Sequence, residues 1–173
     1  SYDEFLNDVG NLLQQASANF PNLPQILYGH SMGGNVVANY AIKRQPKIAG
    51  VILSSPFFNT AFQPPAIKLA VGKLMRNWIP TLSLPSGLDV NAISRDKDVV
   101  KKYSNDPLVF DSISSKMGIE LIEFGQEAVK NAAQLKLPVL LFHGTADQLT
   151  SFDDSKQFAA NAGNNVTFIE YKG

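Results

Sequence analysis

The chain has 173 residues, with 15 basic and 15 acidic side chains, 45% apolar residues and no cysteine. Its length suits one domain with a single core, and its balanced charge lacks the basic surface expected of a nucleic-acid-binding protein. The absence of cysteine excludes disulfides and thiolate chemistry, no apolar run reaches the roughly 18 residues of a membrane span, and the first residues do not resemble a signal peptide. We therefore expect a soluble chain that acts on a small molecule. The lack of cysteine does not decide the compartment, which stays open with the cytoplasm favoured, and the oligomeric state is open as well.

The first predicted element is an amphipathic helix that begins at Ser1 and ends at the prolines of residues 21–24. Ser1 and Glu4 have the spacing of a capping box. Apolar residues then recur on one helical stripe: Phe5, Val9, Leu12, Leu13 and Ala16. Residues 25–28 follow as a short run of large apolar and aromatic side chains, typical of a strand that is buried on both faces.

The sharpest motif is a G-x-S-x-G pattern at residues 29–33, placed between this strand and a predicted helix. The turn is so tight that a side chain at either Gly29 or Gly33 is expected to strike the neighbouring strand or helix. The pattern also arises by chance, but a strand before it and a helix after it are the context that the chemistry needs. We predict that Ser31 is a nucleophile and that the Met32 amide, at the positive end of the helix dipole, supplies half of an oxyanion hole.

The helix ends near Lys43 and Arg44, and a second apolar strand covers residues 48–53. Residues 56–115 then read as an insertion, rich in proline and aromatic residues and without clean alternation of strands and helices. Six apolar residues of its first half are candidates for an acyl-chain site: Phe57, Phe58, Phe62, Leu74, Met75 and Trp78. For each of them the alternative is packing within the core of the insertion itself.

Regular alternation resumes with a helix over 116–133, a strand over 137–142, a helix over 152–161 and a strand over 166–169. This order predicts a parallel sheet with right-handed crossovers. Asp147 follows the third strand, at the sheet edge where active-site groups collect, and is the candidate acid in the chain order serine, acid, histidine. Asp153 and Asp154 are better explained as charges at the N-terminus of the next helix.

The base is missing from this pattern. The chain has two histidines, and both precede Asp147. The side chain of His30 leaves the turn in a different direction from that of Ser31, and we expect a partly buried ring bonded to nearby backbone. His143 is expected to pack or hydrogen-bond locally. Because the chain stops at Gly173, where a histidine loop belongs, we expect a piece of a longer protein that lacks its catalytic histidine.

Five segments together resemble the α/β-hydrolases of the monoacylglycerol lipase, lysophospholipase and serine aminopeptidase-like group: residues 27–34, 54–56, 93–96, 105–108 and 137–147. The resemblance implies a partial α/β-hydrolase fold over residues 1–173, the C-terminal part of one domain. Its mostly parallel sheet has flanking helices and a cap insertion over about 56–115, between the second and third strands. It also implies Ser31 as nucleophile, Asp147 as triad acid and no metal or organic cofactor. The early strands with a second oxyanion donor, and the histidine, have no counterpart here.

Three functions remain open at this stage. The first is a serine hydrolase of small apolar acyl esters such as monoacylglycerols or lysophospholipids, inactive in the chain as given. The second is a serine peptidase of the aminopeptidase type, for which Glu120, Glu123 and Glu127 are candidate ligands of a substrate amine, although their near-helical spacing favours a solvated helix face. The third is a non-catalytic binding module on the same fold. None involves nucleic acid or stable membrane insertion.

Overall fold

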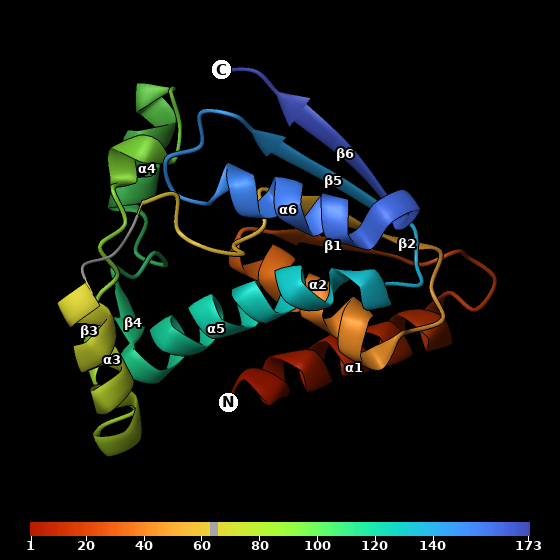
Figure 1. The fold of residues 1–173 in the computed structure, drawn as a ribbon, viewed down its shortest axis with the longest axis horizontal. Helices are drawn as coiled ribbons and strands as arrows, with labels where there is room; N and C mark the ends of the chain where they lie inside the picture. The colour runs from red at the N-terminus through yellow and green to blue at the C-terminus, as the bar shows by residue number, and fades with distance from the viewer. Residues whose placement is uncertain (63–65) are drawn as a thin grey trace.

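A computed structural model describes residues 1–62 and 66–173, and the part of the insertion at 63–65 lies outside them. The chain forms a parallel sheet in the order β1-β2-β5-β6 (Figure 1). Its strands are β1 (Ile26–His30), β2 (Gly50–Ser54), β5 (Val139–Gly144) and β6 (Val166–Tyr171). The predicted parallel sheet is confirmed.

Four helices accompany this sheet: α1 (Tyr2–Asn19), α2 (Met32–Arg44), α5 (Ser115–Asn131) and α6 (Phe152–Ala162). α2 packs against β1 and β2, α6 packs against β5 and β6, and α5 lies against both of these helices. α1 packs on α2 and does not reach the sheet to the same extent. No helix within the described ranges has the length and apolar character to cross a membrane.

The buried stripe of α1 differs from the one predicted. The capping box at Ser1 is present, but Tyr2 and Leu6 are the buried residues of the helix, whereas Leu12 is exposed. Phe5, Val9 and Leu13 are partly buried against the core. The helix faces α2 rather than the sheet, so Tyr2, a polar-tipped residue that the apolar pattern overlooked, becomes part of the core.

The strands are buried on one face only, so the prediction of a doubly buried first strand was wrong. Leu27 is 7% exposed, whereas its neighbours Ile26 and Tyr28 are 57% and 61% exposed. Ile169 and Tyr171 of β6 are exposed as well. The reason is that the helices described here pack on a single face, and parallel sheets are ordinarily covered on both. The second face is thus exposed on the outer strands β1 and β6 and half-buried on β2 and β5.

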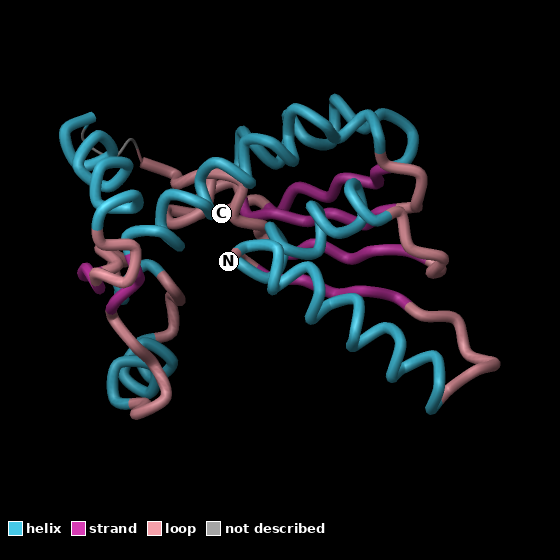
Figure 2. The backbone as a smooth tube through the Cα atoms, turned by 90° about the horizontal axis from the view of Figure 1, so that it is seen from below, coloured by secondary structure: helices cyan, strands magenta, loops and turns pink. Residues whose placement is uncertain are grey.

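The segment between β2 and α5 gathers at one end of the molecule, beyond the carboxyl ends of the strands (Figures 1 and 2). It contains α3 (Ala66–Trp78), β3 (Ser83–Pro85), a 3₁₀ turn (Val90–Ala92), α4 (Lys97–Asn105) and β4 (Ser112–Ser114). β3 and β4 form an antiparallel pair, and α3 packs against α5. We call this segment the cap. It stands beside the edge of the sheet at which Ser31 and Asp147 lie.

Candidate active site

The turn from β1 into α2 holds Ser31 in a strained backbone conformation, with φ 49° and ψ −118°. A non-glycine residue with positive φ stores roughly 1–3 kcal/mol and persists only where the surroundings enforce it. Three backbone hydrogen bonds do so. Ser31 N donates to Ser54 O at 3.1 Å, and Ser31 O accepts from Asn35 N at 3.1 Å and from Phe57 N at 2.9 Å. The serine is thereby fixed to β2 and to the start of the cap.

Gly29 and Gly34 are the glycines of this turn that have no room for a side chain. A Cβ atom at Gly29 would lie 2.5 Å from the carbonyl oxygen of Gly33, and one at Gly34 would lie 2.7 Å from Cβ of Pro56. A Cβ at Gly33 meets nothing within 4 Å. The prediction that both glycines of the motif are sterically required is thus right for Gly29 and wrong for Gly33, because the backbone of Gly33 lies against Gly29 while a Cβ atom at Gly33 would point into open space.

Ser31 lies immediately before α2, and Met32 is the first residue of that helix. The amide of a first helical residue has no acceptor within its own helix and lies at the positive end of the helix dipole. Ser31 is partly exposed. Among the described residues, no hydrogen bond is formed by its side-chain oxygen. The geometry therefore offers a free hydroxyl beside a free amide.

A buried polar network behind this turn was not found from the sequence. Asn35 donates from Nδ2 to Phe57 O at 2.7 Å and to Leu121 O at 2.9 Å, and it accepts from the Tyr2 hydroxyl. Asn39 donates to Tyr2 Oη at 3.1 Å. Burial raises the pKa of Tyr2, and the charge of Glu127 adds to this, whereas the hydrogen bond with Asn39 lowers it by less than burial raises it. Two asparagines four residues apart within an apolar helix are the signal that points to such a network.

The carboxylate of Asp147 lies in the loop after β5 and is held by four donors. Oδ1 accepts from the amides of Leu149 at 2.8 Å and Thr150 at 2.9 Å. Oδ2 accepts from Thr150 Oγ1 at 3.0 Å and lies 3.3 Å from Nε2 of His143. Burial alone would raise the pKa of Asp147, but the hydrogen bonds from His143 and from residues 149–150 outweigh it and hold the pKa well below its usual range. Asp147 is an anion at neutral pH.

Ser31 and Asp147 leave the same edge of the sheet. His30 of β1 is in register with Ser54 of β2, and Ser54 is in register with Phe142 of β5, so β1 and β2 end level and β5 continues two residues further, to Gly144. The strands that precede them, β1 and β5, lie on either side of β2, two interstrand spacings or about 10 Å apart.

A cavity of about 590 Å³ opens at this edge. Its lining includes Ser55, Asp147, Gly173 and the cap residues Ser94 and Arg95. Ser31 is not part of that lining. The acid therefore faces a polar cavity between the sheet edge and the cap, and Ser31 reaches the same edge at the end of β1 without lining that cavity.

Both histidines form hydrogen bonds with residues other than Ser31. His30 is exposed, and its Nδ1 lies 3.0 Å from Ser54 O and 3.2 Å from Ser54 Oγ, so the predicted backbone contact is confirmed but the predicted partial burial is wrong. His143 is fully buried and bonds locally, as predicted.

The six apolar residues predicted for an acyl site lie in three different surroundings. Phe57 and Phe62 line a mostly apolar cavity of about 410 Å³ between the cap and α5. Phe58 is fully buried and stacks on Phe158, with ring centroids 4.5 Å apart. On α3, Leu74 and Trp78 are exposed and Met75 is partly buried. The structure thus brings two of the six together in a cavity.

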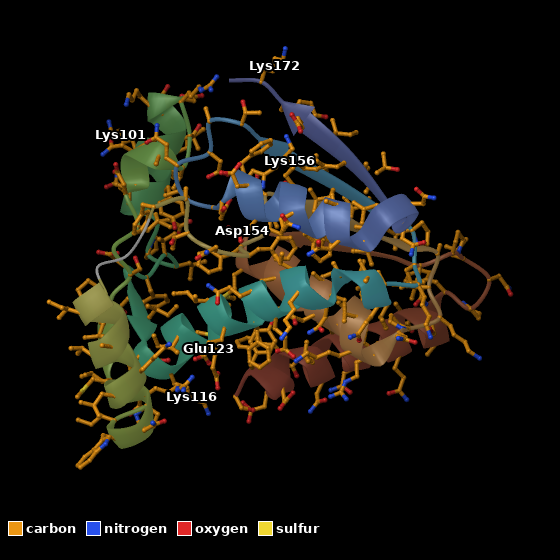
Figure 3. All side chains as sticks on the ribbon, in the orientation of Figure 1. Lys101, Lys116, Glu123, Asp154, Lys156 and Lys172 are labelled. Atoms are coloured by element: carbon orange, nitrogen blue, oxygen red, sulfur yellow. The ribbon has the colours of Figure 1, made fainter. Side chains whose placement is uncertain are left out.

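The acidic candidates lie on helices. On α5, Glu123 pairs with Arg76 at 2.5 Å, Glu127 with Lys43 at 3.1 Å and Glu120 with Lys116 at 3.7 Å. Glu123 and Lys116 are labelled in Figure 3. Asp153 and Asp154 lie in the first turn of α6. In the ranges that the structure covers, no three histidine, aspartate or glutamate side chains gather as metal ligands would.

A parallel sheet with helices against it, a serine at a strained strand-to-helix turn and a cap inserted after β2 define the α/β-hydrolase fold. The family model described as "Serine aminopeptidase, S33" (Hydrolase_4) matches residues 1–173, so the chain belongs to this family.

Known relatives agree with the family. The crystal structure of a monoacylglycerol lipase from Paleococcus ferrophilus superposes with a TM-score of 0.91 at 36% identity, covering 100% of this chain and 66% of that one. A monoacylglycerol lipase from Mycolicibacterium smegmatis is 34% identical over 147 residues, which are 84% of this chain and 52% of that protein. The phospholipase YtpA of Bacillus subtilis is 30% identical over 100% of this chain and 67% of its own length. The chain thus spans about half to two thirds of these relatives.

Proposed function

We propose that the intact protein is a serine hydrolase of lipid-like acyl esters, with Ser31 as nucleophile and Asp147 as the acid that orients its base. The observation that carries this proposal is the strained Ser31 turn, which leaves a free hydroxyl at the N-terminus of α2. Strain of this kind clusters at functional sites. The relatives named above, lipases and a phospholipase, support an ester as the substrate.

In this mechanism the Ser31 oxygen attacks the ester carbonyl while its proton passes to a histidine. The tetrahedral oxyanion accepts a hydrogen bond from the Met32 amide, strengthened by the helix dipole. The histidine then protonates the departing alcohol, and an acyl-enzyme remains. Water, deprotonated by the same histidine, attacks the acyl carbonyl. The bond between the acyl group and the Ser31 oxygen then breaks, the histidine returns its proton to that oxygen, and the carboxylic acid leaves. Because Asp147 stays ionised, it can stabilise the imidazolium at each step.

We place the histidine outside these 173 residues. The ring of His30 is bonded to Ser54, and that of His143 is buried behind Asp147 with both nitrogens engaged. Neither is in hydrogen-bond contact with Ser31 among the described residues. The chain as given is therefore expected to turn over esters at least about a thousandfold more slowly than the intact protein, because triad members act as a unit.

The proposed acyl site is the apolar cavity that Phe57 and Phe62 line. Phe57 is joined to the nucleophile directly, since its amide donates to Ser31 O. Leu84, Ile113 and Ile119 complete an apolar wall. Phe58 belongs to the core, and we leave it out of the site. A peptidase is less well supported, because Glu120, Glu123 and Glu127 each face a cation of the chain itself.

The test compares Ser31→Ala with wild type in the intact protein, using a fluorophosphonate probe and p-nitrophenyl esters. Wild type should be labelled and should hydrolyse medium-chain esters, while Ser31→Ala should lose labelling and at least about a thousandfold in kcat. Ser104→Ala on α4 is the matched serine control and should behave as wild type, because the Ser104 hydroxyl donates to the carbonyl of Val100 within its own helix. Equal labelling of wild type and Ser31→Ala, or turnover of proline p-nitroanilide in place of esters, would contradict the proposal.

A further inference from the structure

His143 is a buried imidazole that the proposed mechanism does not use. It is the penultimate residue of β5, and its side chain is fully shielded from solvent. Its ring meets the ring of Phe152 edge-on, with centroids 5.9 Å apart. A polar group buried this completely is expensive unless it is fully hydrogen-bonded.

Both ring nitrogens have partners. Nδ1 lies 2.8 Å from the hydroxyl oxygen of Ser155, on α6. Nε2 lies 3.1 Å from Thr150 Oγ1 and 3.3 Å from Oδ2 of Asp147. Asp147 is ionised and can only accept hydrogen bonds, so a proton on Nε2 is the arrangement that avoids two lone pairs facing each other. Nδ1 of the neutral ring then accepts from the Ser155 hydroxyl, which selects the tautomer.

We infer that His143 is a positioning residue for Asp147. The Ser155 hydroxyl fixes the tautomer of His143, and the Nε2 proton, together with the Thr150 hydroxyl, fixes Oδ2 of the carboxylate. Oδ1 is already fixed by two backbone amides. The carboxylate therefore cannot rotate without breaking bonds to both β5 and its own loop, and its orientation sets that of the base. This inference rests on the proposed function, in which Asp147 orients the catalytic histidine.

The experiment measures kcat and KM for p-nitrophenyl butyrate in the intact protein, for His143→Leu and His143→Gln. Leucine removes the donor and keeps an apolar side chain in the buried position, whereas glutamine retains an N–H group that can reach the place of Nε2. We expect His143→Leu to lower kcat between about tenfold and a hundredfold with KM within about twofold, the size of effect that misplacement of a catalytic group produces. His143→Gln should recover at least a third of the lost kcat on a logarithmic scale.

Ser155→Ala tests the same chain of bonds with a smaller perturbation. It keeps the imidazole and removes the hydroxyl that selects its tautomer, so kcat should fall between about threefold and tenfold at constant KM. Leu135→Ala, a buried truncation in the segment before β5, is the control for stability. It should lower the melting temperature while leaving kcat unchanged.

The outcomes separate the two proposals. If wild type is inactive and Ser31 is unlabelled, both the proposed function and this inference fail. If wild type is active and His143→Leu and Ser155→Ala keep wild-type kcat, the inference alone fails. It also fails if Leu135→Ala loses as much kcat as His143→Leu, or if glutamine restores nothing, because the effect would then be one of general stability. Should His143→Leu not fold, Ser155→Ala decides.

Discussion

The edge of the sheet and helix α3 of the cap differ in how firmly their side chains are held. At the edge, Ser31 and Asp147 are each held by several hydrogen bonds to neighbouring strands and loops. On α3, Leu74 and Trp78 are 53% and 78% exposed. The proposed catalytic residues are thus held in place by hydrogen bonds to several elements, whereas these side chains of α3 are not packed against the core. Substitutions should therefore cost stability at the edge and little in the cap.

The largest effect is expected for Gly29→Ala. Its new methyl group would lie 2.5 Å from the carbonyl oxygen of Gly33, which is backbone and cannot move without unwinding the start of α2. We expect a loss of about 3 kcal/mol or more in the free energy of unfolding, as for severe overpacking. Chemical denaturation of the protein measures it.

Gly33→Ala is the matched control, since its methyl group would meet nothing within 4 Å. Its free energy of unfolding should stay within about 1 kcal/mol of wild type, because alanine also suits the first turn of a helix. Equal destabilisation by the two substitutions would mean that the turn is not packed as described.

The next effect is expected for Asn35→Ala. The substitution leaves the carbonyl groups of Phe57 and Leu121 without the donor they have now, in a buried site. Orphaning buried polar groups costs about 1–3 kcal/mol. Asn161→Ala is the comparison, because Asn161 also donates to a backbone carbonyl, that of Val129, but from an exposed position. Asn161→Ala should lose less than half as much unfolding free energy as Asn35→Ala, measured by thermal or chemical unfolding. An equal loss would show that the buried network stabilises the protein no more than an exposed hydrogen bond does.

These contrasts mark what the sequence can and cannot predict. Periodicity and breakers were enough for the strands and helices of the parallel sheet, but not for α3, α4, β3 and β4 of the cap, where only an insertion was predicted. The Ser31 turn was found because its chemistry and its local structure share five consecutive residues. Asp147 was placed because parallel strands end at one edge. The exposed Ile26 was missed because burial of a strand face depends on which elements cover it. Bonds such as Asn35 to Leu121 join residues 86 apart, and no local pattern encodes such a pairing.

A smaller effect is expected on lowering the pH. The pKa of Asp147 is depressed in the folded state, because hydrogen bonds to the carboxylate outweigh its burial, whereas the ordinary value is 3.8. Its contribution to stability is thus fully present above about pH 4 and is lost as the pH falls below 3.8 toward the folded pKa. Asp147→Asn removes this titration, so its unfolding free energy should depend less steeply on pH than that of wild type between pH 4 and pH 2. Parallel pH dependences would contradict the low pKa.

The smallest effects on stability are expected in the cap. There, whether a side chain affects activity should depend on whether it lines the apolar cavity, not on how exposed it is. Phe62 and Trp78 are both exposed, so Phe62→Ala and Trp78→Ala should each change the free energy of unfolding by less than about 0.5 kcal/mol. Phe62 lines the apolar cavity, however, and Trp78 does not. Phe62→Ala should lower kcat/KM for a p-nitrophenyl decanoate about tenfold more than for the butyrate, because the longer chain loses the apolar contact. Trp78→Ala should alter that ratio by less than about twofold. If Trp78→Ala shifts it as much as Phe62→Ala does, the acyl chain runs along α3 instead of through the cavity.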